Sequence, residues 1–186
     1  MCPIVEIPTV VREAMPHFSG LFSNEPERVH LSEYVTGLLV ARKKNVSAIS
    51  REFAHGTDQS CLNRWVNEVE WDEKQLNQER LDWLQRTPGL RYSAQGVIAL
   101  DNVLVDHEGK LIEDVGVYWD HADKRYLVAH DYLIANYVCP SGGHYPLEFR
   151  RFVKKTQCEE RAETFKDHNE LFRELVDWSI AQQIPR

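Results

Sequence analysis

The first half of the chain places apolar residues at spacings of three and four, the pattern of helices buried along one stripe. From Val29 to Ala41 this pattern predicts one long helix. Arg42-Lys43-Lys44 follows and places positive charge at the helix C-terminus, where the helix dipole favours it. We expect Asn45 to end the helix in a left-handed cap.

Three more helices are predicted before the pattern changes. They cover Ala48–Ala54, capped by Ser47; a segment that starts at Thr57 or Asp58 and carries Leu62, Trp65, Val66 and Val69; and Glu73–Gln85.

Two breaks delimit this helical region. Residues 1–28 are rich in proline and predict an irregular arm with one short helical piece around Val10–Met15. Thr87-Pro88-Gly89 is a strong breaker after the last helix. We therefore divide the chain into an arm (1–28), a helical region (29–88) and a second region (89–186).

After the breaker, the apolar pattern becomes that of strands. Three antiparallel strands are predicted over Gly96–Val105, around Val115–Trp119 and over Arg125–Val138, with a turn at Glu108-Gly109. Pro146–Val153 is a candidate short extension of the sheet. A final amphipathic helix is predicted from about Ala162 to Gln182, so the fold class is α+β.

The first strand carries the residue that most needs an explanation. Its apolar run is interrupted only by Asp101 and Asn102, which predicts a strand buried on both faces. Burying a carboxylate is costly unless it is paired or bound to a metal. Asp101 is thus either a ligand of a divalent metal or an acid that caps a turn at a fraying strand end. One helix can shield only one face of three strands, so further strands and helices are expected from elsewhere, for example from a partner.

The second and third helices, joined by His55-Gly56-Thr57, resemble a helix-turn-helix. The later helix would then read DNA through Gln59, Ser60, Asn63 and Arg64. The alternative is a small helical bundle with a solvated polar face.

Charge and composition restrict the partners. The formal net charge of −7 disfavours broad nucleic-acid affinity, so DNA binding would need local basic patches. The four cysteines form no Cys-x-x-Cys pair, which fits a reducing cytosol, and no apolar run is long enough for a transmembrane helix. A cytoplasmic protein without a membrane partner is expected.

A second basic cluster lies near the final helix. Arg150, Arg151, Lys154 and Lys155 are either phosphate contacts or part of a solvated face. His107, His121, His130 and His144 show no metal-ligand spacing and are read as hydrogen-bonded loop or strand-end residues.

Several blocks, taken together and in order, resemble the N-terminal half of a DDE-type insertion-sequence transposase (DDE superfamily endonuclease), over about Phe18 to Pro185. The blocks are Leu38-Leu39-Val40-Ala41 through Asn45-Val46-Ser47-Ala48-Ile49, Leu62-Asn63-Arg64-Trp65 through Glu70-Trp71-Asp72-Glu73, Gly96-Val97-Ile98-Ala99-Leu100-Asp101, Gly116-Val117-Tyr118-Trp119-Asp120-His121 with Lys124-Arg125-Tyr126, and His144-Tyr145-Pro146-Leu147-Glu148-Phe149-Arg150.

The resemblance implies a helical DNA-binding region followed by the first part of a ribonuclease-H-like core, with three antiparallel strands and the first helix. It implies that Asp101 is the first carboxylate of a catalytic triad that holds two Mg²⁺ or Mn²⁺ ions on either side of the scissile phosphate. The expected DNA contacts are Arg42, Lys43, Lys44, Gln59, Asn63, Arg64, Arg150, Arg151, Lys154 and Lys155.

Two departures from the family pattern bear on activity. The family often has Asp-Asp-Thr where this chain has Asp101-Asn102-Val103, so a supporting acid and hydroxyl are absent. The second Asp and the Glu of the triad have no matching positions. We expect a chain that is catalytically incomplete alone and binds terminal-repeat DNA. It would act with a second polypeptide or as a homo-oligomer, as an inhibitor of transposition, or as an inactive relic.

Overall fold

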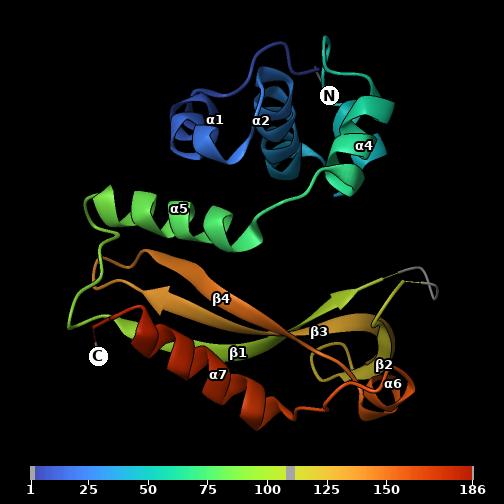
Figure 1. Ribbon diagram of the computed structural model, residues 1–186, viewed down its shortest axis with the longest axis vertical. Helices are drawn as coiled ribbons and strands as arrows, with labels where there is room; N and C mark the ends of the chain where they lie inside the picture. Colours follow the sequence, from blue (N-terminus) through green and yellow to red (C-terminus); the bar gives the residue numbers. More distant parts are fainter. Residues whose placement is uncertain (1–2, 108–111, 186) are drawn as a thin grey trace. The chain divides into compact units, whose positions relative to one another are not determined.

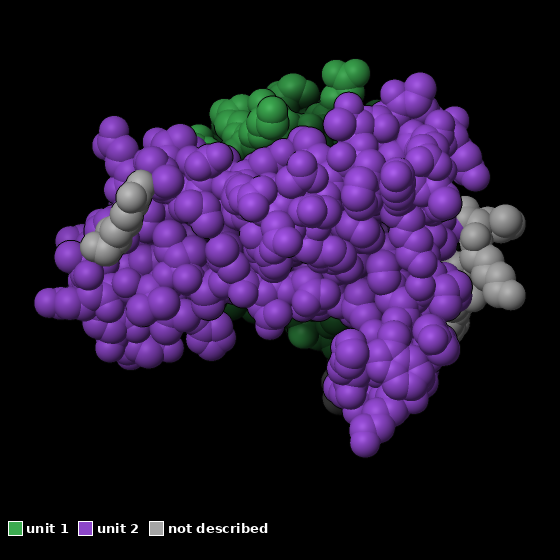
Figure 2. Space-filling view, turned by 90° about the horizontal axis from the view of Figure 1, so that it is seen from below, with its two compact units in different colours: residues 1–83 green, residues 84–186 purple. Residues whose placement is uncertain are grey.

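The computed structural model describes residues 3–107 and 112–185, and it divides into two compact units, Met1–Trp83 and Leu84–Arg186 (Figures 1 and 2). Within the described residues the fold is mixed α+β, with seven α-helices, one 3₁₀ helix and an antiparallel sheet of four strands. The predicted turn at Glu108-Gly109 lies outside the described residues.

Unit 1 is helical. Its elements are α1 (Thr9–Ala14), the 3₁₀ helix η1 (Met15–Leu21), α2 (Glu25–Val40), α3 (Val46–Ser50), α4 (Gln59–Glu68) and most of α5 (Glu73–Arg86), which continues into unit 2.

The N-terminal segment is more helical than the irregular arm predicted for residues 1–28. The short helical piece expected there is α1, and η1 continues it directly. Pro16 and Pro26 lie in the first turns of η1 and α2, where a missing N–H costs nothing, so these prolines start helices instead of breaking them. Asn24 caps α2 by accepting from the Glu27 N–H at 3.0 Å.

The core of unit 1 is one aromatic and aliphatic cluster. It joins Phe18, Phe22, Leu31, Ile49, Leu62 and Trp65, among others. The Trp65 ring lies 4.4 Å from the Trp71 ring and 5.9 Å from that of Phe22. Sequence spacing therefore identified the buried stripe of α4 correctly. In α2 the buried side also contains Glu33 and Thr36, whereas the apolar Leu39 is 62% exposed, so apolar spacing alone did not identify its buried face.

Unit 2 is a sheet built around one long strand. Its strands are β1 (Val97–Asp106), β2 (Gly116–Asp120), β3 (Arg125–Val138) and β4 (His144–Phe152), followed by α6 (Lys155–Glu160) and α7 (His168–Ala181).

Strand β3 is the centre of the sheet. β1 pairs with one edge of β3, while β2 and β4 pair with the other edge in tandem, all antiparallel. The sheet thus has four strands instead of three, because the segment predicted as a short extension at Pro146–Val153 is the full strand β4.

Helix α7 covers one face of this sheet (Figure 1). Its buried residues Leu171, Leu175 and Ser179 pack over β3 and β4. The helix starts at His168 and not near Ala162, because Asp167 and Glu170 form a capping box that fixes its first turn.

The prediction that β1 is buried on both faces is wrong. Most of its residues are exposed, because β1 is an edge strand and α7 lies over β3 and β4. Within the described part of the chain, Cys61, Cys139 and Cys158 are free thiols, and no helix is both long and apolar enough to cross a membrane.

Candidate nucleic-acid interface and acidic site

Helix α4 presents a polar surface above a buried stripe. Leu62 and Trp65 are buried, whereas Gln59, Asn63 and Arg64 are exposed. Successive helical residues turn by about 100°, so these three side chains lie on the outward side of the helix. The residues expected to read DNA are therefore available to a ligand.

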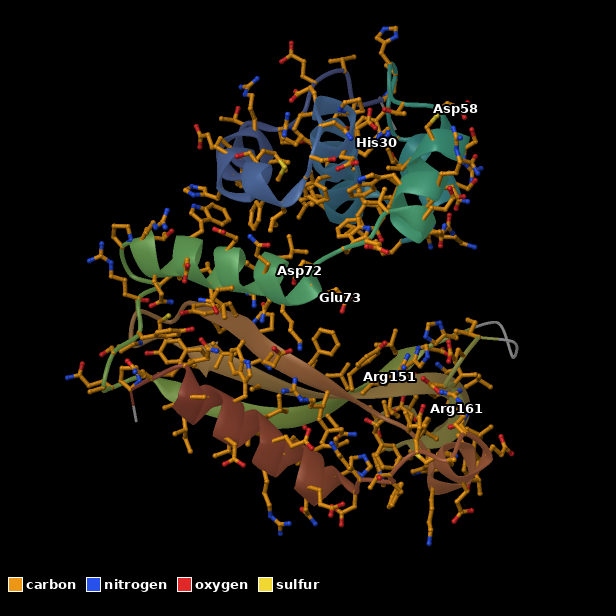
Figure 3. The ribbon with its side chains drawn as sticks, in the orientation of Figure 1. His30, Asp58, Asp72, Glu73, Arg151 and Arg161 are labelled. Carbon is orange, nitrogen blue, oxygen red and sulfur yellow. The ribbon has the colours of Figure 1, made fainter. Side chains whose placement is uncertain are left out.

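Local contacts order the start of α4. Asp58 is its N-cap, and its carboxylate accepts hydrogen bonds from the Ser60 N–H at 2.8 Å and from the Ser60 hydroxyl (Figure 3). These bonds to Ser60 hold the pKa of Asp58 below its usual value. Arg64 donates to Cys61 Sγ at 3.3 Å, and this bond raises the pKa of Arg64.

The connection between α3 and α4 runs from Arg51 to Asp58 and is longer than the turn of a typical helix-turn-helix. Glu33 of α2 is buried and supports this connection, because its Oε1 accepts from the Thr57 N–H at 2.8 Å. Sequence reasoning missed this contact, since Glu33 lies within the helical pattern of α2 like any surface acid.

The three basic residues after α2 differ in their contacts. Lys44 Nζ donates to the Leu38 and Ala41 carbonyl oxygens and so satisfies the C-terminal end of α2. Arg42 and Lys43 are exposed, and their side chains form no hydrogen bond or ion pair with any residue that the structure describes. The predicted left-handed cap at Asn45 is wrong: Asn45 is extended, with φ −125°, and caps α3 by accepting from the Ala48 N–H, the role predicted for Ser47.

The second predicted basic cluster is engaged within the protein. Arg150 pairs with Glu148 and Glu174, Arg151 with Asp114, and Lys155 with Glu159; Lys154 donates to the Val117 carbonyl oxygen and lies 4.7 Å from the centre of the Tyr118 ring. These contacts favour the structural interpretation of the cluster over phosphate binding.

Asp101 lies in the middle of β1, and its side chain is exposed. Its partner across the ladder is Ile134, and its Oδ1 accepts from the Asn102 N–H at 2.8 Å. The metal hypothesis assumed that this carboxylate is buried at a high cost in free energy. An exposed carboxylate carries no such cost.

The acids that are buried in unit 2 are others. Asp114 is fully buried and pairs with both Arg151 and Arg161, whose side chains converge at one end of the sheet (Figure 3). Burial alone would lower the pKa of Arg161, but its hydrogen bond to Asp114 and the charge of that carboxylate outweigh burial and raise it.

A second buried acid organises the covered face of the sheet. Asp131 accepts from His168 Nε2 at 2.8 Å and from Asn102 Nδ2 at 3.3 Å, and the His168 ring stacks on Phe152 at 4.1 Å. These contacts join β1, β3, β4 and the start of α7. The spacing of these residues along the chain gives no signal for the cluster, because strand pairing brings them together.

Two of the histidines form a chain of hydrogen bonds. His130 Nε2 lies 2.7 Å from the Glu113 carbonyl oxygen and donates to it, and His130 Nδ1 lies 2.8 Å from His107 Nε2. This arrangement agrees with the expected hydrogen-bonding role of these histidines. Among the described residues, no group of three or more His, Cys, Asp or Glu side chains could hold a metal ion.

Comparison of the chain with models of known protein families and with solved structures found no match.

Proposed function

We propose that this chain is the N-terminal part of a DDE-type insertion-sequence transposase, which binds the DNA at the ends of its element and contributes the first acidic residue of the catalytic core. The observation that carries the proposal is the position of Asp101, which lies midway along the first long strand with its carboxylate exposed. A rigid strand holds a catalytic carboxylate more accurately than a loop does.

The order of elements supports the proposal. A helical unit precedes strands β1, β2 and β3, and helix α7 comes after β4. This is the order that the resemblance implies for the DNA-binding region and the first part of a ribonuclease-H-like core, with β4 as an additional strand.

DNA binding would come from unit 1. Gln59, Asn63 and Arg64 on α4 would reach base edges, and Arg42 and Lys43 would contact phosphates. The net charge of −7 makes such local contacts necessary, since the chain as a whole repels DNA.

Asp101 and its immediate neighbours on the sheet do not form a two-metal site on their own. Its neighbours on the same face are apolar, with Ile134 across the ladder and Ala99 and Val103 two positions away on β1. Mg²⁺ or Mn²⁺ would activate a water molecule or a 3′-hydroxyl once a second polypeptide supplied two further carboxylates. The residues present here therefore support DNA binding and not strand cleavage.

The contrast between the packed helical unit 1 and the isolated Asp101 of unit 2 favours a second candidate function. Unit 1 has a buried hydrophobic core of its own, whereas Asp101 has no acidic companion on its part of β1. A chain that binds element ends without cutting them would compete with an intact transposase and so inhibit transposition.

DNA binding is tested with the full chain and labelled duplexes that tile the DNA flanking its coding sequence. We expect selective binding to one or two duplexes, with an affinity that falls steeply as salt rises. Arg64→Gln should weaken binding about tenfold or more, as the loss of a specific contact does. Arg12→Gln is the matched control, since Arg12 is an exposed arginine of α1 that, among the described residues, bonds only to the Thr9 hydroxyl.

Absence of binding to every duplex at low salt would overturn both candidate functions. A nicking assay with Mg²⁺ or Mn²⁺ separates them from a complete enzyme: we expect no cleavage by the isolated chain, and metal-dependent cleavage would show that the acidic site is complete.

A further inference from the structure

The sheet of unit 2 has one face that its own helices leave uncovered. Residues that pair across a ladder share a face, and α7 lies on the face of Leu133, Ala135 and Tyr137. The opposite side, which we name the open sheet face, carries every exposed large apolar residue of the four strands except Leu100. Its members are Val97, Val103, Val105, Val117, Trp119, Tyr126, Val138 and Phe149.

The exposed apolar area is large for a protein surface. Tyr126 is 71% exposed, Phe149 is 54% exposed and Trp119 is 42% exposed. Given the size of such side chains, the open sheet face offers on the order of 700 Å² of apolar surface. Patches beyond a few hundred Å² mark interaction sites, and a typical stable interface buries about 800 Å² on each partner.

The composition of this face indicates a protein partner. Trp, Tyr and Arg are the residue types that contribute most to protein interfaces, and Trp119, Tyr126 and Arg151 all lie here. Exposed aromatic side chains on a sheet can also stack on single-stranded nucleic acid, but such sites need a basic groove. The strand residues of this face include the acid Asp101 beside Arg151, so the two charges offset each other and do not form a basic groove.

We propose that the open sheet face binds a second copy of this chain, face to face, to form a two-fold symmetric dimer. A two-fold axis along β3 would lay β1 of each copy over β4 of the other, in the aligned packing of a β-sandwich. The area of the face matches what such a dimer needs.

Charge complementarity selects this occupant. Asp101 lies in the row of Ile134 and Phe149, and Arg151 lies in the neighbouring row with Val103 and Tyr132. Across the proposed axis, Asp101 of one copy lies opposite Phe149 of the other and within the reach of its Arg151. The Arg151 side chain is 43% exposed, so it keeps donors free beyond its pair with Asp114.

Each Asp101 would thus meet one Arg151 of the other copy, the pair would occur twice by symmetry, and neither charge would be buried alone. Asp101 lies inside this interface, so the dimer would not present it to DNA. The proposal itself rests on the apolar face and does not depend on the function proposed above.

Sedimentation velocity of the full chain over a wide concentration range tests the dimer. We expect a monomer–dimer equilibrium, and Phe149→Lys should raise the dimer dissociation constant about tenfold or more. Tyr126→Lys is a second interface variant. Because Tyr126 is highly exposed, this substitution should leave the fold intact, so weaker dimerisation would not be due to misfolding. Val176→Lys is the matched control, because Val176 is an exposed valine on the outer side of α7.

A chain that stays monomeric at all concentrations would overturn the proposal, including the case in which unit 1 of the same chain covers the face. Dimerisation that survives both interface variants, or that only Val176→Lys abolishes, would place the interface elsewhere and overturn it equally. Circular dichroism of each variant checks that it is folded.

Discussion

Replacing the buried acid Asp114 tests whether the arginines around it stabilise the fold or are available as DNA contacts. Its carboxylate is fully buried, while the Arg151 and Arg161 side chains that pair with it are 43% and 32% exposed. The residue has φ 60°, which asparagine tolerates, so Asp114→Asn removes the charge without new backbone strain.

The expected loss follows from this partial burial. Removing one partner of a fully buried ion pair costs about 3–5 kcal/mol, and removing one from an exposed pair costs up to about 1 kcal/mol. Water can hydrate both guanidinium groups in part once the carboxylate is gone. We therefore expect Asp114→Asn to lower the free energy of unfolding of unit 2 by about 2–3 kcal/mol, which corresponds to a drop in Tm of about 10–20 °C.

Scanning calorimetry and urea unfolding measure the effect. Asp123→Asn is the matched control, because Asp123 is an exposed acid that pairs with exposed Arg125 at 3.3 Å, and it should change stability by less than about 1 kcal/mol. If both variants have the same small effect, the reasoning is refuted: Asp114 does not depend on its arginines, and Arg151 returns as a candidate DNA contact.

Two further predictions concern packing and ionisation. In Gly37→Ala the new Cβ would lie 2.1 Å from Ile49 Cγ2, so urea unfolding of unit 1 should show a loss of about 1–3 kcal/mol despite a better helix propensity; Gly20→Ala, which meets nothing within 4 Å, should leave stability unchanged. Burial, then the charges of Asp131 and Asp114, raise the pKa of Tyr118 from 10.0 to about 12. The resulting stabilisation is complete below pH 10 and is lost as pH rises towards 12. An absorbance titration should show one tyrosine that ionises at higher pH than the others, and Tyr118→Phe should remove this late phase. An unchanged late phase in that variant would contradict the assignment.

Local pattern predicted the helices well because their signals lie close together in sequence. Spacings of three and four located α2 and α4, and Asp58 was correctly identified as a candidate cap for α4. Asn45 was misassigned because asparagine is favoured at both ends of helices, and only the extended backbone at that residue distinguishes the two roles.

The position of each strand in the sheet was harder to predict. The apolar run of β1 looks the same whether the strand is central or at an edge, and pairing with β3 decides that question. This is why the exposure of Asp101 was missed. The clusters around Asp114 and Asp131 join segments from β1 to α7, so no short window of sequence contains them.

The shared central strand sets an order of assembly during folding. β3 and β4 are joined by a tight turn in which the Cys139 N–H donates to the Gly143 carbonyl oxygen at 2.7 Å, so this hairpin closes a short loop. β1 has to come from a point much earlier in the chain to reach the other side of β3, and closing the longer loop costs more entropy. The β3–β4 hairpin should therefore form before β1 pairs and serve as its template, so the folding chain would expose one edge of β3 until β1 pairs with it.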